Sequence, residues 1–270
     1  MALPTTGLTF HADASVVTDL WKVETGGSFS SHPADGEGTP YWDDVEHADI
    51  VAAETSAAPE WRSGTPLMLL PCLDFDGAGD FYTLANNDNT AAKALSALIT
   101  NSAFTIMVSV YVDAIATNAA NPYDNDAIIA DNGGFFGIHL KTGNAVFYNW
   151  DGNADSIVLP ISLATSYVLM FRHEGGNIYA SLNGGAESSA ASGNTSDVSN
   201  TVRIGKNNGS GNKFFNGRMG EIAVWNVALT GSDLTDAHAY FAAKWLEAEV
   251  PSEVWSWNTG TSIRRSRFGG

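Results

Sequence analysis

The chain has 270 residues, one cysteine and a formal net charge of −17 at pH 7. A single cysteine excludes an intramolecular disulfide framework and a cysteine-based zinc site. The excess of acidic residues opposes binding to phosphate backbones, so we expect no nucleic-acid partner. Hydrophobic residues make up 44% of the chain, which allows a sizeable core and excludes disorder as the default state.

The first residues, Met1 to Gly7, contain neither the basic nor the apolar segment of a signal peptide. No apolar run approaches the roughly 18 residues of a membrane span, so we expect no membrane partner. Low charge and many glycine, asparagine, serine and threonine residues are typical of extracellular and virion β proteins. The combination predicts release by cell lysis within a virus particle; a chain whose leader has been removed is the alternative.

The N-terminal quarter of the chain is predicted to be mostly irregular. Leu8, Phe10 and Ala12 alternate with polar neighbours and indicate one strand. Glycines and prolines between residues 26 and 40 indicate turns. The alanine-rich stretch from Asp49 to Ala58 predicts a short helix.

From residue 67 onward, strand patterns recur about every ten residues with turn formers between them, which predicts an antiparallel sandwich. The exception is 91–100, which has helical spacing. The clearest strand places one set of apolar residues on one face, and that set is Phe104, Ile106, Val108, Val110 and Val112. Asn183-Gly184 is a strong hairpin signal.

A C-terminal helix is predicted after the last strand. Thr230 and Asp233 form a capping pair, and Pro251 ends the element. The helix is expected to lie across one open end of the sandwich. Its apolar face is formed by Leu234, His238, Phe241 and Trp245, and we interpret His238 as a core residue.

Several segments resemble laminin G-like, concanavalin A-like jelly rolls. The opening of that family is matched by Leu73-Asp-Phe-Asp-Gly-Ala-Gly-Asp-Phe-Tyr and by Phe104-Thr-Ile-Met-Val-Ser-Val-Tyr-Val. Its close is matched by Ile178-Tyr-Ala-Ser-Leu-Asn-Gly, Val202-Arg-Ile-Gly and the stretch from Phe215 to Thr230. The resemblance implies an all-β antiparallel sandwich with a short C-terminal helix and peripheral extensions.

Upstream segments resemble the lead-in of such domains in bacteriophage and environmental bacterial proteins. They are Gly7-Leu-Thr-Phe-His-Ala-Asp-Ala-Ser, Tyr41-Trp-Asp-Asp and Pro59-Glu-Trp-Arg. We assign residues 1–66 to an N-terminal strand and irregular extension of the sandwich, 67–250 to the jelly roll, and 251–270 to a C-terminal interaction arm. Because lectins, glycosidases, adhesion modules and virion proteins share this fold, function has to be argued from a site.

No catalytic pattern is found, so we predict that the chain is not an enzyme. Sugar hydrolysis needs two carboxylates about 5–10 Å apart, and the strand that carries Glu221 has no second acid. We interpret Glu221 as a strand-edge residue. Only two distant carboxylates that converge in a cleft would favour a glycoside hydrolase.

Calcium is the only cofactor that the sequence suggests. Asn149, Asp151, Asn153 and Asp155 place oxygen side chains at alternate positions of one loop, and a solvated hairpin loop is the alternative. A second acidic cluster comprises Asp124, Asn125, Asp126 and Asp131. Asp76 and Asp80 flank a glycine-rich turn, and we interpret them as capping that turn rather than binding a metal.

Exposed aromatic rings beside polar loops would provide carbohydrate contact, because the C–H faces of sugars stack on rings. Trp150 and Tyr123 lie beside the two acidic loops and are the candidates. The alternative for Trp150 is that it faces the second sheet or a neighbouring subunit. Trp225 and Trp245 are expected in the core.

The segment after the predicted helix combines aromatic and basic residues. Its candidate partner-binding residues are Trp255, Trp257, Arg264, Arg265 and Arg267. Such an arm would dock on an acidic neighbouring subunit through arginine forks and buried rings, and a frayed terminus is the alternative.

The sequence therefore favours a structural subunit of a bacteriophage particle, located in the virion as a capsid decoration or spike protein or as part of a tail or fibre. Its expected partners are other virion subunits, a second copy of itself in a homo-oligomer, and a host surface glycan. A carbohydrate-binding lectin is the alternative function, and a glycoside hydrolase is a third.

Overall fold

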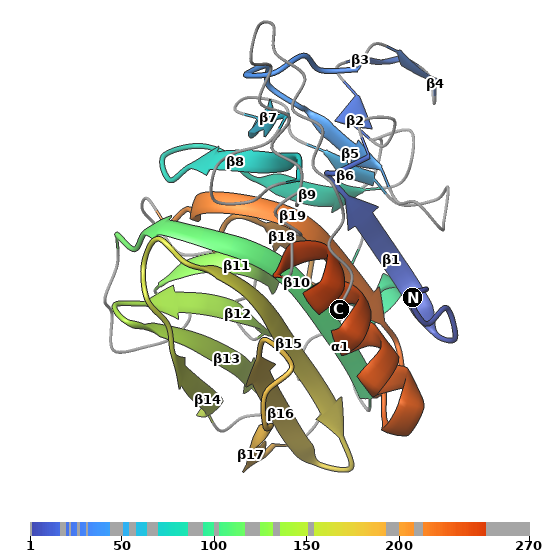
Figure 1. Cartoon of the computed structure of the whole chain (residues 1–270), viewed down its shortest axis with the longest axis vertical. Coiled ribbons are helices and arrows are strands. Elements are labelled where there is room, and N and C mark those ends of the chain that lie inside the picture. The colour runs from blue at the N-terminus through green and yellow to red at the C-terminus, as the bar shows by residue number, and fades with distance from the viewer. Residues whose placement is uncertain are drawn as a thin grey trace, which may run out of the picture.

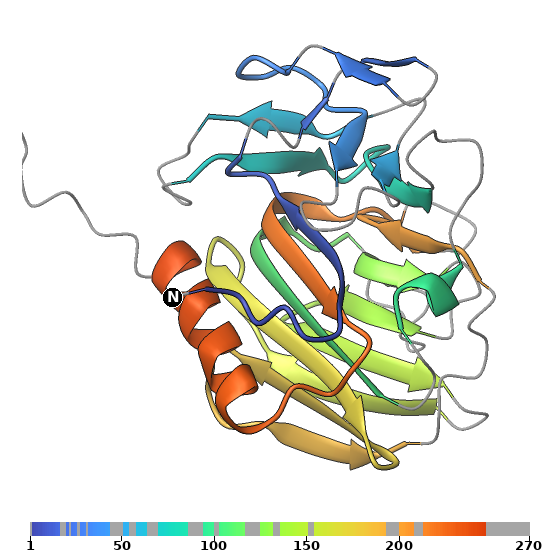
Figure 2. The same ribbon diagram turned by 90° about the vertical axis from the view of Figure 1, so that its right-hand side faces the viewer.

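A computed structural model of the chain describes residues 2–16, 20–21, 23–25, 28–30, 32–43, 51–53, 58–63, 70–85, 94–99, 103–116, 125–131, 136–150, 154–192, 200–207 and 213–246. Within these residues the fold is a sandwich of two large antiparallel β-sheets with one α-helix (Figures 1 and 2). The all-β concanavalin A-like architecture expected from the sequence is confirmed.

The first sheet has eight strands among the described residues, in the order β17-β16-β15-β10-β19-β8-β7, and β1 also pairs with β19. Strands β1 and β8 both pair with β19, at opposite ends of that strand. The strands are β1 (Leu8–Asp13), β7 (Glu60–Arg62), β8 (Cys72–Asp76), β10 (Ala103–Ala114), β15 (Ser166–Glu174), β16 (Asn177–Leu182), β17 (Ser188–Ala191) and β19 (Asn216–Trp225).

The second sheet has nine described strands, in the order β14-β13-β12-β11-β18-β9-β6-β5-β2. The strands are β2 (Leu20–Trp21), β5 (Tyr41–Asp43), β6 (Val51–Ala53), β9 (Tyr82–Ala85), β11 (Asp126–Asp131), β12 (Phe136–Lys141), β13 (Asn144–Trp150), β14 (Ala154–Pro160) and β18 (Val202–Ile204). A separate hairpin consists of β3 (Val23–Thr25) and β4 (Ser28–Ser30).

The main core lies between the two sheets and is formed by side chains that alternate along the strands. The predicted apolar face of β10 is buried there in full. Phe104 of β10 lies edge-on to Phe136 and Phe171, with ring centroids 5.3 and 5.2 Å apart. These ring contacts join strands from both sheets and fix the distance between the layers.

Helix α1 (Gly231–Trp245) packs on the outer face of the eight-stranded sheet (Figures 1 and 2). Phe241 and Trp245 pack in a second apolar cluster with outward residues of β10 and β19, among them Met107 and Trp225. The prediction that this helix closes an open end of the sandwich is therefore wrong, because these outward residues of the sheet are themselves apolar and have to be covered.

Three local predictions about helices also need correction. Val51–Ala53 forms strand β6 between β5 and β9, so pairing on both edges overrides the helix propensity of the alanine-rich stretch. Thr230 is the N-cap of α1, but its side chain makes no capping hydrogen bond. Gly231 has φ of 55°, which departs from helical geometry at this end. Of 91–100, the described residues contain a β-bridge from Ala94 to Thr201 and a 3₁₀ turn, η2 (Leu95–Ala97), but no α-helix.

Candidate functional site

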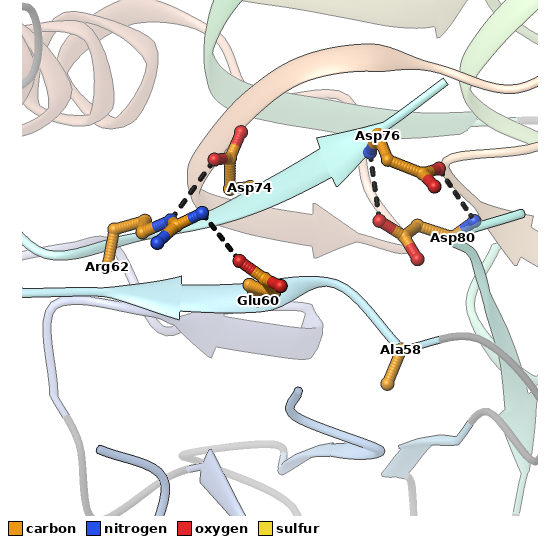
Figure 3. A pocket seen from close by; sticks show the side chains of 6 residues that line it. All are labelled: Ala58, Glu60, Arg62, Asp74, Asp76 and Asp80. Carbon is orange, nitrogen blue, oxygen red and sulfur yellow. Dashed lines mark hydrogen bonds and ion pairs between the residues drawn. The ribbon is translucent and has the colours of Figure 1, made fainter. Parts of the chain in front are cut away.

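A polar pocket of about 220 Å³ opens beside β7, β8 and the turn that follows β8 (Figure 3). In the register of the sheet, Glu60 of β7 lies opposite Asp74 of β8, so both side chains are on one face. Asp74 and Asp76 are two residues apart and share this face, while Leu73 and Phe75 point into the core. The lining residues are Ala58, Glu60, Arg62, Asp74, Asp76 and Asp80.

Arg62 holds two of the carboxylates of the pocket in place. Its Nη2 lies 2.5 Å from Oε2 of Glu60, and its Nε donates to Oδ2 of Asp74 at 3.2 Å. Figure 3 shows the guanidinium between the two acids. Asp74 is also 3.7 Å from the Nε of Arg218 on β19. Glu60 and Asp74 therefore have cationic partners within the protein.

Asp76 caps the turn that forms one end of the pocket. Its Oδ1 accepts backbone N–H groups of Ala78 at 2.7 Å and Gly79 at 2.9 Å. Gly77, between Asp76 and Ala78, has φ of 73°, a left-handed conformation that favours glycine. The prediction that Asp76 and Asp80 cap this turn is confirmed, because Asp80 Oδ2 accepts the N–H of Asp76 at 2.8 Å.

Asp80 is the most buried carboxylate of the pocket, with 7% of its surface exposed. Burial, together with the negative charges of Asp76, Glu60 and Asp74, raises its pKa to about 6 despite the hydrogen bond from Asp76. Its second oxygen points away from Asp76, towards the side of the pocket where Ala58 lies (Figure 3). Among the described residues, no cation forms an ion pair with this carboxylate.

A second cluster of titratable groups lies beneath α1. Glu221 of β19 accepts from Trp245 Nε1 at 2.6 Å and from the Tyr240 hydroxyl at 2.9 Å. Its Oε1 is 2.6 Å from Nε2 of His11, and its Oε2 is 2.9 Å from the Lys244 ammonium. Lys244 also donates to Asp13.

The prediction that Glu221 is a strand-edge residue is wrong. Its strand pairs with β1 on one side and β10 on the other, its side chain is fully buried, and α1 supplies three of its partners. Burial disfavours ionisation, but the hydrogen bond from His11 and the charge of Lys244 outweigh it and lower the pKa of Glu221. The strand itself carries no second acid; β1 brings Asp13 alongside instead.

His11, Asp13 and Glu221 have ligand-type atoms within 4.8 Å of one another, which is close enough to hold a metal ion. The ammonium of Lys244, however, contacts both carboxylates and supplies the compensating positive charge. A metal would have to displace it. We therefore interpret this cluster as the polar attachment of α1 to the sheet.

Most of the predicted metal and sugar ligands are not placed by the structure. Asn149 is buried and its Nδ2 donates to Ser192 Oγ at 3.1 Å. The side chains of Trp150 and Asp155, and all of Tyr123, Asp151 and Asn153, lie outside what the structure describes. The same holds for Trp255, Trp257, Arg264, Arg265 and Arg267 of the tail. Calcium at this loop stays a prediction.

In the second predicted acidic cluster, Asp126 and Asp131 have structural partners. Asp126 accepts the N–H of Ala116 at 2.7 Å, and Asp131 accepts from the N–H of Phe136 at 2.8 Å and from Asn200 at 2.6 Å. Asn125 is buried beside them in the chain, and Asp124 lies outside the described residues. His238 is half-buried on α1, where burial lowers its pKa.

Glu60, Arg62 and Asp74 were not predicted as site residues. A signal was present, since Glu-Trp-Arg and Asp-Phe-Asp each alternate polar residues around an apolar one. The pairing of β7 with β8, which brings the two segments together, cannot be read from either segment alone.

Comparison with known proteins places the chain in a family. Residues 84–235 match the model of the concanavalin A-like lectin/glucanases superfamily, of laminin G type, so the chain belongs to this family. The six residues that line the pocket all precede the matched segment. No curated protein matches the chain. Among the described residues, no helix is both long and apolar enough to cross a bilayer.

Solved structures with the same fold include carbohydrate-active proteins. Trypanosoma rangeli sialidase in complex with sialic acid is 15% identical with a TM-score of 0.54, over 88% of this chain and 33% of the sialidase. Domain 4 of AbnA, a GH43 extracellular arabinanase from Geobacillus stearothermophilus, in complex with arabinotriose, is 14% identical with a TM-score of 0.50, over 87% of this chain and all of that domain.

The binding domain of Paraclostridial Mosquitocidal Protein 1 is 14% identical with a TM-score of 0.55, over 87% of this chain and 52% of that chain. At these identities the likeness shows the shared fold. The chain spans about one third of the length of the sialidase. A concanavalin A-like lectin/glucanase-type domain is thus shown, and its ligand has to be inferred from its own residues.

Proposed function

We propose that this protein is a carbohydrate-binding module that holds one sugar unit in the pocket between Arg62 and Asp80. The observation that carries the proposal is the pocket itself, which is lined by four carboxylates and one guanidinium on paired strands and a capped turn. Sugar hydroxyls both donate and accept hydrogen bonds, so they match carboxylate acceptors beside an arginine donor.

The size and rigidity of the pocket support this proposal. Its volume of about 220 Å³ lies below the roughly 300–1,000 Å³ of sites for drug-sized ligands, which suits a single sugar ring. Arg62 fixes Glu60 and Asp74, and the turn fixes Asp76 and Asp80. A polar site whose side chains are held before the ligand arrives loses less conformational entropy on binding.

Binding is favoured over hydrolysis at this pocket. A glycosidase needs one carboxyl as acid and a second as base or nucleophile. Glu60 and Asp74 are engaged by Arg62, and Asp76 is engaged by three N–H groups of its turn. Among the described residues, Asp80 is the one pocket carboxyl that has no cation and only a single N–H partner, and one carboxyl does not supply both roles. We therefore propose that the chain is not a glycoside hydrolase.

The test is binding of a glycan library to the whole chain, followed by calorimetry on two matched variants. Glu60→Gln alters a pocket carboxylate that is 47% exposed and paired with Arg62. Glu174→Gln alters a carboxylate that is 46% exposed and paired with Arg172, away from the pocket. We expect Glu60→Gln to weaken binding about tenfold and Glu174→Gln to leave it unchanged.

The outcomes separate this pocket from the site expected from the sequence. Glycan binding that is lost in Trp150→Ala but retained in Glu60→Gln would move the site to the 149–155 loop. A chain that binds no glycan would contradict the proposal as a whole. Release of reducing ends from a bound glycan would contradict the assignment as a non-enzyme.

The bacteriophage role remains a second candidate, supported by the combination of rings and arginines in residues 251–270. We propose that deletion of 252–270 leaves the domain folded and prevents assembly into a particle or homo-oligomer. Truncated protein that assembles as the full chain does would contradict that role. Virion localisation and the virion partners stay predictions with it.

A further inference from the structure

Building on the proposed carbohydrate function, we propose that the pocket is specific for an amine-bearing sugar, whose ammonium group pairs with Asp80. Four carboxylates and one guanidinium line the pocket, so it has an excess of negative charge when all of the acids are ionised. A ligand that brings a positive charge would reduce this excess.

The two arginines near the pocket form ion pairs with two of its acids, Glu60 and Asp74. Arg62 contacts both Glu60 and Asp74. Arg218 lies 3.7 Å from Asp74 and 3.5 Å from Asp113, on the side of Asp74 towards β19. These ion pairs compensate Glu60 and Asp74 within the protein.

Asp76 is stabilised as an anion by its own turn. Backbone N–H groups of Ala78 and Gly79 donate to its Oδ1, and the N–H of Asp80 approaches the same oxygen at 3.4 Å. Although burial opposes ionisation, these hydrogen bonds prevail and lower the pKa of Asp76. This carboxylate therefore needs no cation from a ligand.

Asp80 differs from the other three acids. It is more than nine-tenths buried, one of its oxygens accepts a single N–H, and its other oxygen points away from that donor, towards the side of Ala58 (Figure 3). The charged neighbours that shift its pKa are all acidic and raise it; they are Asp76, Glu60 and Asp74. A buried carboxylate in this setting is an incomplete ion pair that an ammonium donor would complete.

The spacing of the acids favours an organic cation over a metal ion. Among the described residues, the only group of three or more acidic, histidine or cysteine side chains close enough for a metal is His11, Asp13 and Glu221 beneath α1. The pocket acids do not converge in that way. An ammonium group needs one close carboxylate, and the sugar ring that carries it can use the remaining donors and acceptors.

The charge also excludes sugars that carry a carboxylate. A sialic acid or a uronic acid would place its anion beside carboxylates that already repel one another. Neutral sugars escape that repulsion but leave Asp80 without a cation. The expected order of affinity is therefore amine-bearing, then neutral, then acidic sugars.

The experiment compares oligosaccharides that differ in one substituent of each ring, at the second carbon for the amine and the acetamide and at the sixth carbon for the carboxylate. Titration calorimetry near neutral pH would use equal-length β-1,4 oligomers of glucosamine, glucose, N-acetylglucosamine and glucuronic acid. We expect the glucosamine oligomer to bind at least about tenfold more tightly than the glucose oligomer. The glucuronic acid oligomer is expected to bind most weakly.

Two variants assign the preference to Asp80. Asp80→Asn keeps an oxygen acceptor for the N–H of Asp76 and removes the charge, so we expect the glucosamine oligomer to fall to the affinity of the glucose oligomer. Asp113→Asn removes a carboxylate from the same sheet face that does not line the pocket, and we expect it to retain the full preference. Circular dichroism of both variants checks that they are folded.

The possible results separate the two proposals. If the glucose oligomer binds as tightly as the glucosamine oligomer, the ammonium inference is overturned while the carbohydrate function survives. If none of the oligomers binds, the ammonium inference is overturned, and the glycan library described above decides whether the carbohydrate function survives. If calcium chloride or butylamine alone binds as tightly as the glucosamine oligomer, in an Asp80-dependent manner, the site recognises a cation rather than an amino sugar and the inference is overturned.

Discussion

Asp76 and Asp80 each accept a backbone N–H group from the other across the turn after β8. The N–H of Asp76 is 2.8 Å from Asp80 Oδ2, and the N–H of Asp80 is 3.4 Å from Asp76 Oδ1. Their titration differs because their surroundings differ. Asp76 gains two further N–H donors and its pKa is lowered, whereas burial and neighbouring acids raise the pKa of Asp80 to about 6.

Replacing Asp80 should stabilise the protein in a pH-dependent manner. The ordinary pKa of an aspartate is 3.8 and that of folded Asp80 is about 6, so the folded state binds more protons than the unfolded state between these values. Stability from this group is therefore greatest below pH 3.8 and is lost as the pH rises to about 6. We expect Asp80→Asn to be about 1–2 kcal/mol more stable than wild type at pH 8 and equal to it at pH 4.

Urea unfolding of both proteins across this pH range measures the difference. Glu174→Gln serves as the control, since Glu174 is paired with Arg172 and lies away from the pocket. A difference in stability that does not change with pH would contradict the assigned cause. The expected gain on removing the charge agrees with the inference above, because groups placed for ligand binding commonly lower the stability of the fold.

The pocket shows what the sequence could and could not predict about the site. The capping roles of Asp76 and Asp80 were predictable, because an aspartate next to glycines has a local partner within a few residues. Glu60 and Arg62 were not, because their partner Asp74 lies on another strand. The register between β7 and β8 sets that contact, and register is a property of the whole sheet.

Removing the charge of Lys244 should destabilise the protein strongly. Its ammonium is the cation for both Asp13 and Glu221, and Glu221 is fully buried. Lys244→Met leaves these carboxylates without that partner, and we expect a loss of about 3–5 kcal/mol in the free energy of unfolding. Urea denaturation at neutral pH gives this value.

Lys141 at the end of β12 offers a matched control for that substitution. It is half-buried, and we expect Lys141→Met to change the stability by less than about 0.5 kcal/mol. Equal effects of the two substitutions would show that Lys244 of α1 has no special role. The interpretation of this cluster as the attachment of α1 would then fail.

The histidine of this cluster should make stability depend on pH near neutrality. Burial opposes its protonation, but the hydrogen bond to Glu221 and the charges of Glu221 and Asp13 outweigh burial and Lys244 and raise the pKa of His11 above its ordinary 6.5. A raised histidine pKa stabilises the fold fully below pH 6.5, and this contribution is lost as the pH rises through the folded value.

We therefore expect the advantage of wild type over His11→Gln to be largest at about pH 6 and to shrink towards about pH 9. Glu221, Tyr240 and Lys244 do not titrate oppositely in this window. The pKa of Glu221 is lowered from 4.5, and those of Tyr240 and Lys244 are raised from 10.0 and 10.5. An advantage that grows with pH would contradict the assigned direction.

The fold was more predictable than the site because its signals are repeated. Alternation from Phe104 to Val112 identifies a strand and the face that enters the main core, because several residues give the same signal. The position of α1 depends instead on which outer sheet face is apolar. Met107, Met170 and Ala223 form that face only after β10, β15 and β19 pair, so helix amphipathicity alone could not place it.

Two glycines in left-handed conformations should tolerate alanine very differently. Gly205 and Gly143 have φ of 85° and 73°, so either substitution places alanine in a region that costs it about 1–2 kcal/mol. A Cβ on Gly143 would meet nothing within 4 Å, whereas one on Gly205 would lie 2.5 Å from a ring carbon of Phe75. That ring cannot move aside, because it packs between Tyr82 and Phe215 in the core.

We expect Gly205→Ala to destabilise the protein by at least about 2 kcal/mol more than Gly143→Ala, since overpacking adds to the shared backbone cost. Thermal unfolding of the two variants in parallel measures the difference directly. Because the backbone cost of alanine is common to both variants, the comparison isolates the packing of Phe75 against Gly205, directly after β18. Equal melting temperatures would mean that the aromatic core next to the pocket is looser than the structure shows, and the preorganised turn that holds Asp80 would lose its support.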